Sequence, residues 1–418
     1  MNYILLIVAS FVLLTHHPIS AQDNEGTYLK DTKTGCKVWY KIGFEEDSVH
    51  WTGGCKNGLA DGRGTFTGYT HGKQSSKYTG DMKAGKPDGT GSFSFWGGTG
   101  KLKGHFTKGE FLNLSSRCMD HLQKDIVSET DSLQTYVGDD NARQLYVHAI
   151  APAPPIRGAI VLMPGNWETT EHLLSSNKKL CDLAYENHLA VLALSINQRL
   201  TMTTDVLALM NTMLANAQQR YNIPKDKFVI GGWSMGGLFS LRYSEFACQD
   251  SAKTTLKPVA AFCCDGPCDL ENLYLNAKKK LQKFPVNGES QYIIRELEKY
   301  CGGPPETYRQ QYSIYSCYTH ARPDGGNANY LKNIPVRIYN DVDPNWWMEN
   351  RHVDMYEMNA LDQSAMILGL QEMGNTRAEF INAFGKGYRI EGNRHPHSWS
   401  IVEPEDCIKW ILKCLGEN

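Results

Sequence analysis

The sequence predicts two folded parts: a small all-β repeat domain, then a larger α/β domain whose sheet is mostly parallel. Residues 22–113 are rich in glycine and contain a repeated motif, which favours short β-hairpins. From about residue 136, short apolar runs alternate with longer amphipathic stretches, a pattern typical of a parallel sheet covered by helices. A length of 418 residues suits two domains.

The overall composition is that of a globular protein with a substantial core, since 41% of the residues are hydrophobic and 21% are charged. The formal net charge is −2, which gives no electrostatic reason to expect a nucleic-acid partner. In residues 22–113 the basic residues exceed the acidic ones only slightly, so membrane association through a polybasic patch is not expected.

The first 21 residues have the pattern of an export signal. The apolar run from Ile4 to Leu14 is too short to cross a bilayer but suits a signal peptide, and Ser20-Ala21 precede a plausible cleavage point. The remaining chain holds 12 cysteines, an even number that suits disulfide formation in an exported protein. We therefore expect a secreted, periplasmic or cell-surface protein. No Cys-x-x-Cys pairs recur at zinc spacing, so neither a structural metal nor a cofactor is expected.

The repeat is clearest in two stretches, WTGGCKNGLADGRGTF at 51–66 and YTGDMKAGKPDGTGSF at 78–93. A partial third copy, LKGHFTKG, occupies 102–109. We expect stacked hairpins in which the glycines permit tight turns with positive φ and the aromatic residues cover one face. This pattern resembles the membrane occupation and recognition (MORN) repeat family. Cys36 and Cys55 flank the first strand-like stretch, where a disulfide would clip the hairpin closed.

Residues 114–135 are of mixed polar character and are expected to link the repeats to an α/β domain spanning 136–418. The runs expected to be buried strands are 157–165, 188–196, 227–232, 258–264 and 334–340, and those expected to be helices are 204–222 and 406–415. Residues 269–333 contain no strand-like run and many tyrosines, which predicts a cap over the active site.

A candidate nucleophile lies in the motif Gly232-Trp233-Ser234-Met235-Gly236. The apolar run at 228–230 precedes it and a helical run at 238–247 follows, so the serine is placed on a sharp strand-to-helix turn. In this motif and its context, from about residue 140 to the end, the chain resembles the α/β-hydrolase family. The resemblance implies a serine hydrolase whose acid and histidine follow Ser234 in that order.

Two aspartates and two histidines compete for the remaining roles. Asp343 follows the strand expected at 334–340 and precedes a proline, as the acid of the family often does; Asp341 is the alternative. The segment RHPHSWS offers His397 and His395, which are two positions apart, so only one can reach Ser234. His397, followed by a small residue and an aromatic one, is the expected base, and His395 is the alternative.

The expected oxyanion hole consists of the backbone N–H of Met235 and that of Asn166 or Trp167, in a loop that departs from the HGGG form of many lipases. These residues predict a secreted hydrolase of carboxylic esters, acting on a small-molecule or glycan-linked acyl ester. The alternatives are a serine peptidase of the same fold and a non-catalytic surface binding or scaffold protein that uses the β-repeats. Because the repeats hold no candidate base, nucleophile or metal set, we expect them to be dispensable for the chemical step.

Overall fold

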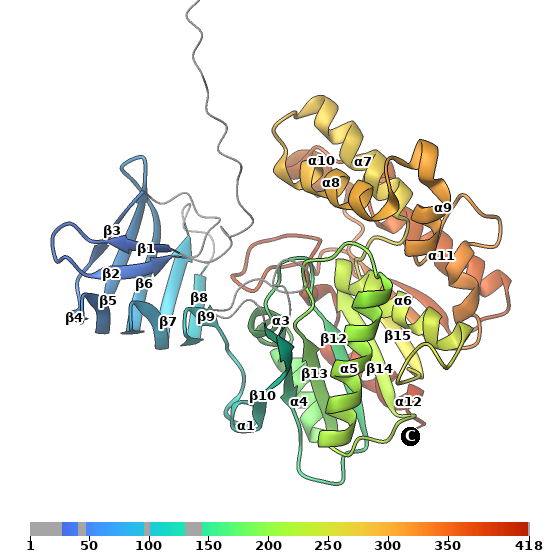
Figure 1. Ribbon diagram of the computed structural model, residues 1–418, viewed down its shortest axis with the longest axis horizontal. Helices are drawn as coiled ribbons and strands as arrows, with labels where there is room; N and C mark the ends of the chain where they lie inside the picture. Colours follow the sequence, from blue (N-terminus) through green and yellow to red (C-terminus); the bar gives the residue numbers. More distant parts are fainter. Residues whose placement is uncertain (1–26, 41–46, 96–100, 130–143, 417–418) are drawn as a thin grey trace, which may run out of the picture.

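The computed structural model describes residues 27–40, 47–95, 101–129 and 144–416, and contains two β-sheets that lie side by side (Figure 1). The expected signal peptide, residues 1–21, lies outside the described residues. None of the helices in the described ranges combines the length and apolar character needed to cross a membrane.

The first sheet is built from the repeats. Its strands are β1 (Thr27–Lys30), β2 (Lys37–Tyr40), β3 (Ser48–Trp51), β4 (Gly54–Lys56), β5 (Leu59–Thr70), β6 (Lys73–Lys83), β7 (Lys86–Phe95), β8 (Lys101–Thr107) and β9 (Glu110–Phe111). From β5 to β9 each strand pairs antiparallel with the next, as the expected stacked hairpins require. Phe66 and Phe93 pair in register with Tyr78, so the repeated aromatic residues form a row across the sheet.

The repeated glycines have two different structural roles. Gly64, Gly80, Gly91 and Gly104 pair in register across four strands, and none of them has a positive φ. A Cβ on Gly91 would lie 2.4 Å from the hydroxyl of Tyr78, whose buried ring covers the neighbouring strand. Gly64, Gly80 and Gly91 therefore make room for the aromatic rings of Trp51 and Tyr78, whereas Gly104 makes room for the side chain of Asn113. Gly58, Gly62, Gly85 and Gly89 do have positive φ, as expected for turns and bulges.

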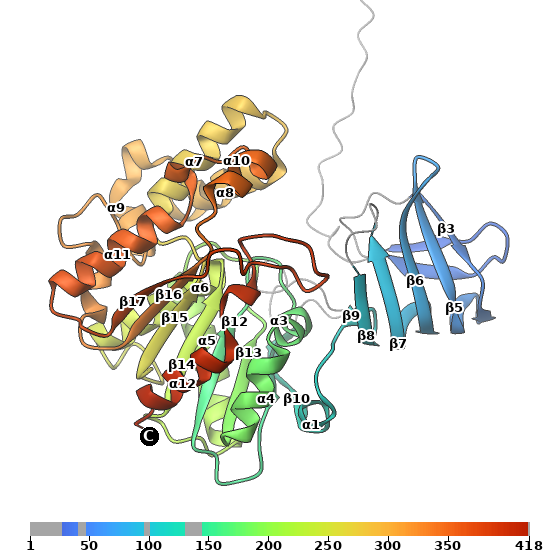
Figure 2. The same ribbon diagram turned by 180° about the vertical axis from the view of Figure 1, so that it is seen from behind.

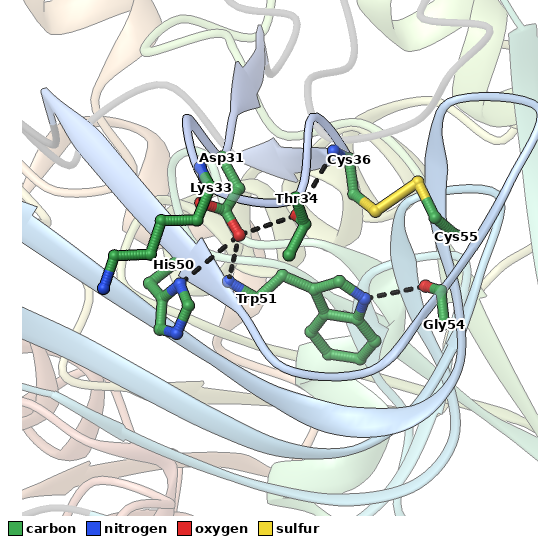
Figure 3. The surroundings of a disulfide bond; sticks show 8 residues. All are labelled: Asp31, Lys33, Thr34, Cys36, His50, Trp51, Gly54 and Cys55. Atoms are coloured by element: carbon green, nitrogen blue, oxygen red, sulfur yellow. Dashed lines mark hydrogen bonds and ion pairs between the residues drawn. A yellow bond between two sulfur atoms is a disulfide. The ribbon is translucent and has the colours of Figure 1, made fainter.

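A disulfide joins Cys36, at the start of β2, to Cys55 in β4 (Figure 3). It therefore ties two neighbouring hairpins together. Beside it the carboxylate of Asp31 accepts hydrogen bonds from the Thr34 hydroxyl (2.7 Å) and the Trp51 N–H (3.0 Å). Burial alone would raise the pKa of Asp31, but these hydrogen bonds outweigh it and lower the pKa to about 2. The other cysteines are free and mostly buried, where they pack as small apolar residues.

The second sheet has eight strands (Figure 2). They are β10 (Leu122–Glu129), β11 (Gln144–Ile150), β12 (Gly158–Met163), β13 (Leu189–Leu194), β14 (Phe228–Trp233), β15 (Ala260–Cys264), β16 (Val336–Asn340) and β17 (Ala378–Asn382). Their order is β10-β11-β13-β12-β14-β15-β16-β17, with antiparallel pairing up to β13 and parallel pairing beyond it. All five strands expected from the sequence are present, and this mostly parallel sheet is that of an α/β-hydrolase fold.

Helices cover both faces of this sheet. The helices next to it are α3 (Thr170–Ser176), α4 (Lys178–Glu186), α5 (Thr204–Arg220), α6 (Met235–Gln249) and α12 (Pro404–Cys414). Side chains of α5 and α6 share one core with Val161, whereas those of α4 and α12 share the other with Ile160. Because neighbouring residues of β12 point to opposite faces and both faces are buried, the strand is apolar throughout.

Two insertions form the cap over one end of the sheet (Figures 1 and 2). Between β15 and β16 lie α7 (Leu270–Lys283), α8 (Gly288–Cys301), α9 (Pro305–Tyr315) and the 3₁₀ helix η1 (Gly326–Leu331). Between β16 and β17 lie α10 (Pro344–Arg351), the 3₁₀ helix η2 (Met355–Glu357) and α11 (Ala360–Glu372). The sequence prediction of a cap at 269–333 identified only the first insertion.

The segment expected to be a linker belongs to the second sheet. Residues 116–120 form the short helix α1 (Ser116–Asp120), and β10 pairs along its length with β11. The side chain of Ser115 is hydrogen-bonded to Asp182 of α4. Because β10 is a partly exposed edge strand, its sequence does not show the regular apolar pattern of a buried strand. Even the apolar residue Ile126 is exposed. The remainder of the expected linker, 130–135, lies outside the described residues.

The two sheets are joined by specific contacts. The N–H of Asn113 donates to Ser175 Oγ of α3 (2.8 Å). On the other side, the segment that follows β17 extends to the repeats, where the N–H of Lys101 donates to the carbonyl of Glu391 (3.0 Å), and Ile390 packs against the aromatic core of the repeats. A residue of the hydrolase part thus completes the core of the repeat domain.

Candidate active site

Ser234 occupies the turn between β14 and α6, with φ 55° and ψ −125°. A positive φ is strained for a serine, and this conformation sets the residue off from both strand and helix. Its N–H donates to the carbonyl of Cys264 in β15 (2.9 Å), which fixes the turn to the adjacent strand. The local geometry is that of the nucleophile elbow expected from the sequence.

Glycine is needed two residues before and two residues after Ser234, because a Cβ at either position would clash with the backbone. A Cβ on Gly232 would lie 2.3 Å from the carbonyl of Gly236, and a Cβ on Gly236 would lie 2.2 Å from the carbonyl oxygen of Met163 in β12. No side chain fits at either position unless the backbone moves. The two glycines therefore allow α6 to begin directly after Ser234, as the sequence motif suggested.

His397 is the histidine that shares a cavity with Ser234. Its Nδ1 is 2.6 Å from Oδ2 of Asp265, and its ring lies against that of Trp233 with centroids 4.9 Å apart. Because Asp265 engages Nδ1, Nε2 is the nitrogen left to act on Ser234. Among the described residues no hydrogen bond joins His397 to Ser234, a contact that commonly tightens only when substrate binds.

Asp265 follows β15 directly and is held by a buried network. Its Oδ1 accepts hydrogen bonds from the side-chain amides of Asn340 (2.7 Å) and Asn359 (3.1 Å). The amide of Asn340 also donates to Gln363 of α11, whose own amide donates to the carbonyl of Gly266. These bonds fix the carboxylate and leave its other oxygen for His397.

The expected acid, Asp343, does not contact His397. Its Oδ1 caps α10 by accepting the N–H of Trp346 (3.1 Å), and its Oδ2 is 2.8 Å from a guanidinium nitrogen of Arg394. The alternative, Asp341, is buried and accepts the N–H groups of Gly385 and Gly387 as well as Arg394. Both carboxylates thus hold the segment after β17 in place, and Asp265, instead of either expected acid, is the carboxylate that contacts His397.

His395 is placed in surroundings unsuited to a base. Its Nε2 is 3.1 Å from the guanidinium of Arg351, and its ring lies against those of Trp346 and Trp347. Burial, reinforced by the charges of Arg389 and other nearby cations, lowers the pKa of His395 to about 2. A group with so low a pKa accepts a proton poorly near neutral pH, which favours His397.

The expected oxyanion residues differ in what their N–H groups do. Met235 is the first residue of α6, where a backbone N–H has no partner within the helix. Trp167 has φ 60°, and its N–H is already engaged by the carbonyl of Asn197 (2.7 Å). Of the two candidates in this loop, Asn166 is therefore the one that remains, and its side-chain oxygen accepts a hydrogen bond from Tyr292 of the cap (3.4 Å).

The loop that carries Asn166 is fixed by the buried carboxylate of Glu168. It accepts the N–H of Gly165 (2.9 Å), pairs with Nδ1 of His172 (2.8 Å) and accepts the indole N–H of Trp399 (2.9 Å). Trp399 lies two residues after His397. Glu168 therefore connects the oxyanion loop to the segment that carries the histidine.

These residues surround a cavity of about 310 Å³. Ser234, Met235, Asp265, His397, Asn166 and Trp167 all line it, together with Tyr292 and Ile293 of α8 and Arg389 after β17. In the described ranges of the chain, no group of three or more His, Cys, Asp or Glu side chains is arranged to hold a metal ion.

Sequence reasoning missed Asp265, Glu168 and Arg389. For Asp265 a signal existed: the residue directly follows a fully apolar strand run, and the carboxyl ends of neighbouring parallel strands meet at one edge of the sheet. Glu168 and Arg389 carried no such signal, because the contacts that tie them to this site, with Trp399 and with Trp233, join residues that are remote in the chain.

No protein-family model matches the chain, and no curated protein matches it in sequence. Among solved structures, MPT51 of Mycobacterium tuberculosis aligns over 71% of this chain and 98% of its own, with 11% identity and a TM-score of 0.43. A carboxyl esterase of the fungus Tuber melanosporum covers 71% and 85%, with 15% identity and a TM-score of 0.44. An esterase of Thermogutta terrifontis covers 71% and 94%, with 12% identity and a TM-score of 0.44. Strand order, the strained serine turn and the Asp265–His397 pair identify residues 122–129 and 144–416 as an α/β-hydrolase fold.

Proposed function

We propose that this protein is an exported serine hydrolase that cleaves a carboxylic ester through an acyl-enzyme. Ser234 is the nucleophile, His397 the general base and Asp265 the residue that orients the histidine. The observation that carries the proposal is the 2.6 Å contact between His397 and Asp265 in the cavity that Ser234 also lines. An oriented histidine beside an elbow serine is the arrangement that activates a serine hydroxyl.

In the proposed reaction Nε2 of His397 takes the hydroxyl proton as Ser234 Oγ forms a bond to the ester carbonyl carbon. The carbonyl oxygen becomes an oxyanion, which the N–H groups of Met235 and Asn166 would stabilise. The intermediate then collapses, the bond to the alcohol oxygen breaks, and His397 returns the proton to the leaving alcohol. A water molecule, deprotonated by His397, releases the acid from Ser234 by the same steps.

The proposed substrate is a small-molecule or glycan-linked acyl ester. The cavity volume of about 310 Å³ lies at the lower end of ligand-binding pockets, which favours a small ester over a polypeptide. Export is supported by the apolar run Ile4–Leu14 and by the Cys36–Cys55 disulfide. The repeat sheet, which we assign to the MORN-like type, accompanies the enzyme without supplying a catalytic group.

The proposal is tested with a fluorophosphonate probe and a panel of acyl esters and aminoacyl amides. We expect covalent labelling at Ser234, ester turnover, and loss of both in Ser234→Ala, by about 10³-fold or more for turnover. Ser364→Ala, an exposed serine on α11, is the matched control. Absence of labelling in folded protein would support the non-catalytic alternative, and faster cleavage of amides than of esters would support a peptidase.

A further inference from the structure

The cavity contains a guanidinium that lacks an acidic partner. Arg389 lines it beside the candidate catalytic residues, and its Cζ is 4.8 Å from the ring centroid of Trp233. Among the described residues, no carboxylate forms an ion pair with Arg389. Arg389 is partly buried, and the three arginines of this domain that are buried more deeply each have an acidic partner: Arg199 with Asp205, Arg242 with Glu245 and Arg337 with Glu379.

This position is costly for a cation. Burial is the main influence on Arg389, and it lowers the pKa of the guanidinium from its usual value, although the charges of Glu168, Glu391 and Asp265 act in the opposite direction. A desolvated charge that no carboxylate contacts directly is normally destabilising, so its retention calls for a compensating interaction. The face of Trp233 supplies part of it as a cation–π contact.

The other charged residues of the cavity are already engaged or exposed. Asp265 pairs with His397, and Glu357 lies 3.5 Å from Lys279 and also accepts the N–H of Asp354. Glu289 is exposed in the first turn of α8. Among the lining residues, Arg389 therefore provides the positive charge that remains for a ligand.

We propose that Arg389 binds a carboxylate of the substrate, so that the preferred ester is one that carries an acidic group. This inference rests on the proposed ester hydrolysis. The planar guanidinium fits a carboxylate through two parallel hydrogen bonds. Arg389 and His397 both pack on the indole of Trp233, so a carboxylate bound by Arg389 would lie close to the reacting ester.

The guanidinium is positioned from outside the hydrolase domain. The neighbouring Ile390 packs into the aromatic core of the repeats, and Lys101 of β8 holds the carbonyl of Glu391. The backbone of Arg389 is also closed into a tight turn, because its N–H donates to the carbonyl of Asn393 (2.8 Å). These contacts fix the segment from which Arg389 reaches the cavity.

The test compares pairs of esters in which one member carries a carboxylate and the other an uncharged group at the same place. On the leaving-group side, 4-acetoxybenzoate is compared with 4-acetoxybenzamide, and on the acyl side, monomethyl adipate is compared with methyl hexanoate. We expect the wild-type protein to favour the acidic member of at least one pair in kcat/KM. Arg389→Gln should lower that preference by about 10- to 100-fold, and Arg389→Lys should retain part of it.

Arg351→Gln is the matched control, because Arg351 is exposed and does not line the cavity. We expect it to change the preference by less than about threefold. Equal turnover of both members of each pair, or equal effects of the two glutamine variants, would overturn the role of Arg389. Absence of fluorophosphonate labelling in folded wild-type protein would instead refute the hydrolase proposal. Failure of the proposal for Arg389 can therefore be distinguished from failure of the proposed ester hydrolysis.

Discussion

The indole N–H of Trp399 donates to the buried carboxylate of Glu168 at 2.9 Å, which joins the histidine segment to the oxyanion loop. Trp399→Phe should keep most of the packing but remove this bond. The two halves of the site would then move relative to each other, and we expect kcat to fall on the order of 10-fold with a smaller change in KM. Trp410→Phe, a buried tryptophan of α12, is the control. Equal losses in both variants would mean that packing, and not the hydrogen bond, is responsible.

Exchange of each candidate acid for asparagine separates their roles. Asp265→Asn leaves a side chain of the same shape but favours the wrong tautomer of His397, and we expect kcat to fall by about 10³- to 10⁴-fold. Asp343→Asn keeps a residue that caps α10 well and loses only the ion pair with Arg394, so the expected loss is below about 10-fold. Both are measured by steady-state ester hydrolysis. The reverse ranking would restore Asp343 as the acid.

The depressed pKa of His395 predicts a specific dependence of stability on pH. The pKa is about 2 in the folded protein and 6.5 for an unperturbed histidine. Below pH 6.5 the unfolded chain therefore binds a proton that the folded chain does not, so His395 lowers stability progressively as the pH falls from 6.5 towards 2. In His395→Gln the thermal midpoint should fall less steeply between pH 7 and pH 4.5. Parallel curves for the two proteins would contradict the placement of His395.

His395→Gln also separates the two histidines in catalysis. If His397 is the base, the variant should keep a pH–rate limb near the histidine pKa of about 6.5. His397→Gln should remove turnover and leave no limb to measure. A limb that disappears in His395→Gln while turnover persists would assign the titration to His395.

The glycine row of the repeats predicts a local stability effect. Gly91→Ala places a Cβ 2.4 Å from the Tyr78 hydroxyl, and we expect a loss of about 1–3 kcal/mol in the free energy of unfolding. In a Tyr78→Leu background the same change should cost less, because the ring that causes the conflict is absent. Gly369→Ala in α11, where a Cβ meets nothing within 4 Å, should be neutral or stabilising. Denaturant unfolding of the wild type, the three single variants and the double variant measures these differences.

The repeats are expected to be dispensable for the chemical step, but the contacts of Ile390 with their core predict an effect on substrate preference. Ile390→Ser should loosen the segment that carries Arg389 while fluorophosphonate labelling of Ser234 persists. We expect the preference for acidic esters to fall by about 3- to 10-fold. Leu368→Ser, at an exposed position of α11, is the control. An unchanged preference in Ile390→Ser would show that the repeats do not influence the cavity.

The sequence predicted the features that are set by neighbours in the chain. Strand runs at the centre of the sheet are apolar on both faces, and the elbow glycines are spaced by the turn itself, so both were visible. The hairpin repeats were visible for the same reason, since consecutive strands pair. The edge strand β10 was not, because partial exposure removes the apolar pattern.

The identity of the acid depended on tertiary contacts. Asp343 and Asp265 both follow strands of the parallel sheet, and a rule based on chain order cannot tell which strand end faces His397. Arg394 pairs with both Asp341 and Asp343, and these ion pairs keep the two carboxylates engaged away from His397. That arginine lies more than fifty residues from each of them, where no local pattern connects them.

The position of Asp265, the proposed acid, directly after β15 has a consequence for inactivation by heat. Ser234 and Asp265 follow adjacent parallel strands, the Ser234 N–H is bonded to Cys264, and a Cβ on Gly266 would lie 2.5 Å from the Ser234 carbonyl. Ser234 and Asp265, the proposed nucleophile and acid, thus belong to one rigid unit, whereas His397 lies on a long loop. Mild heating should therefore first displace the histidine and abolish the proposed ester hydrolysis reversibly, well before the central sheet unfolds.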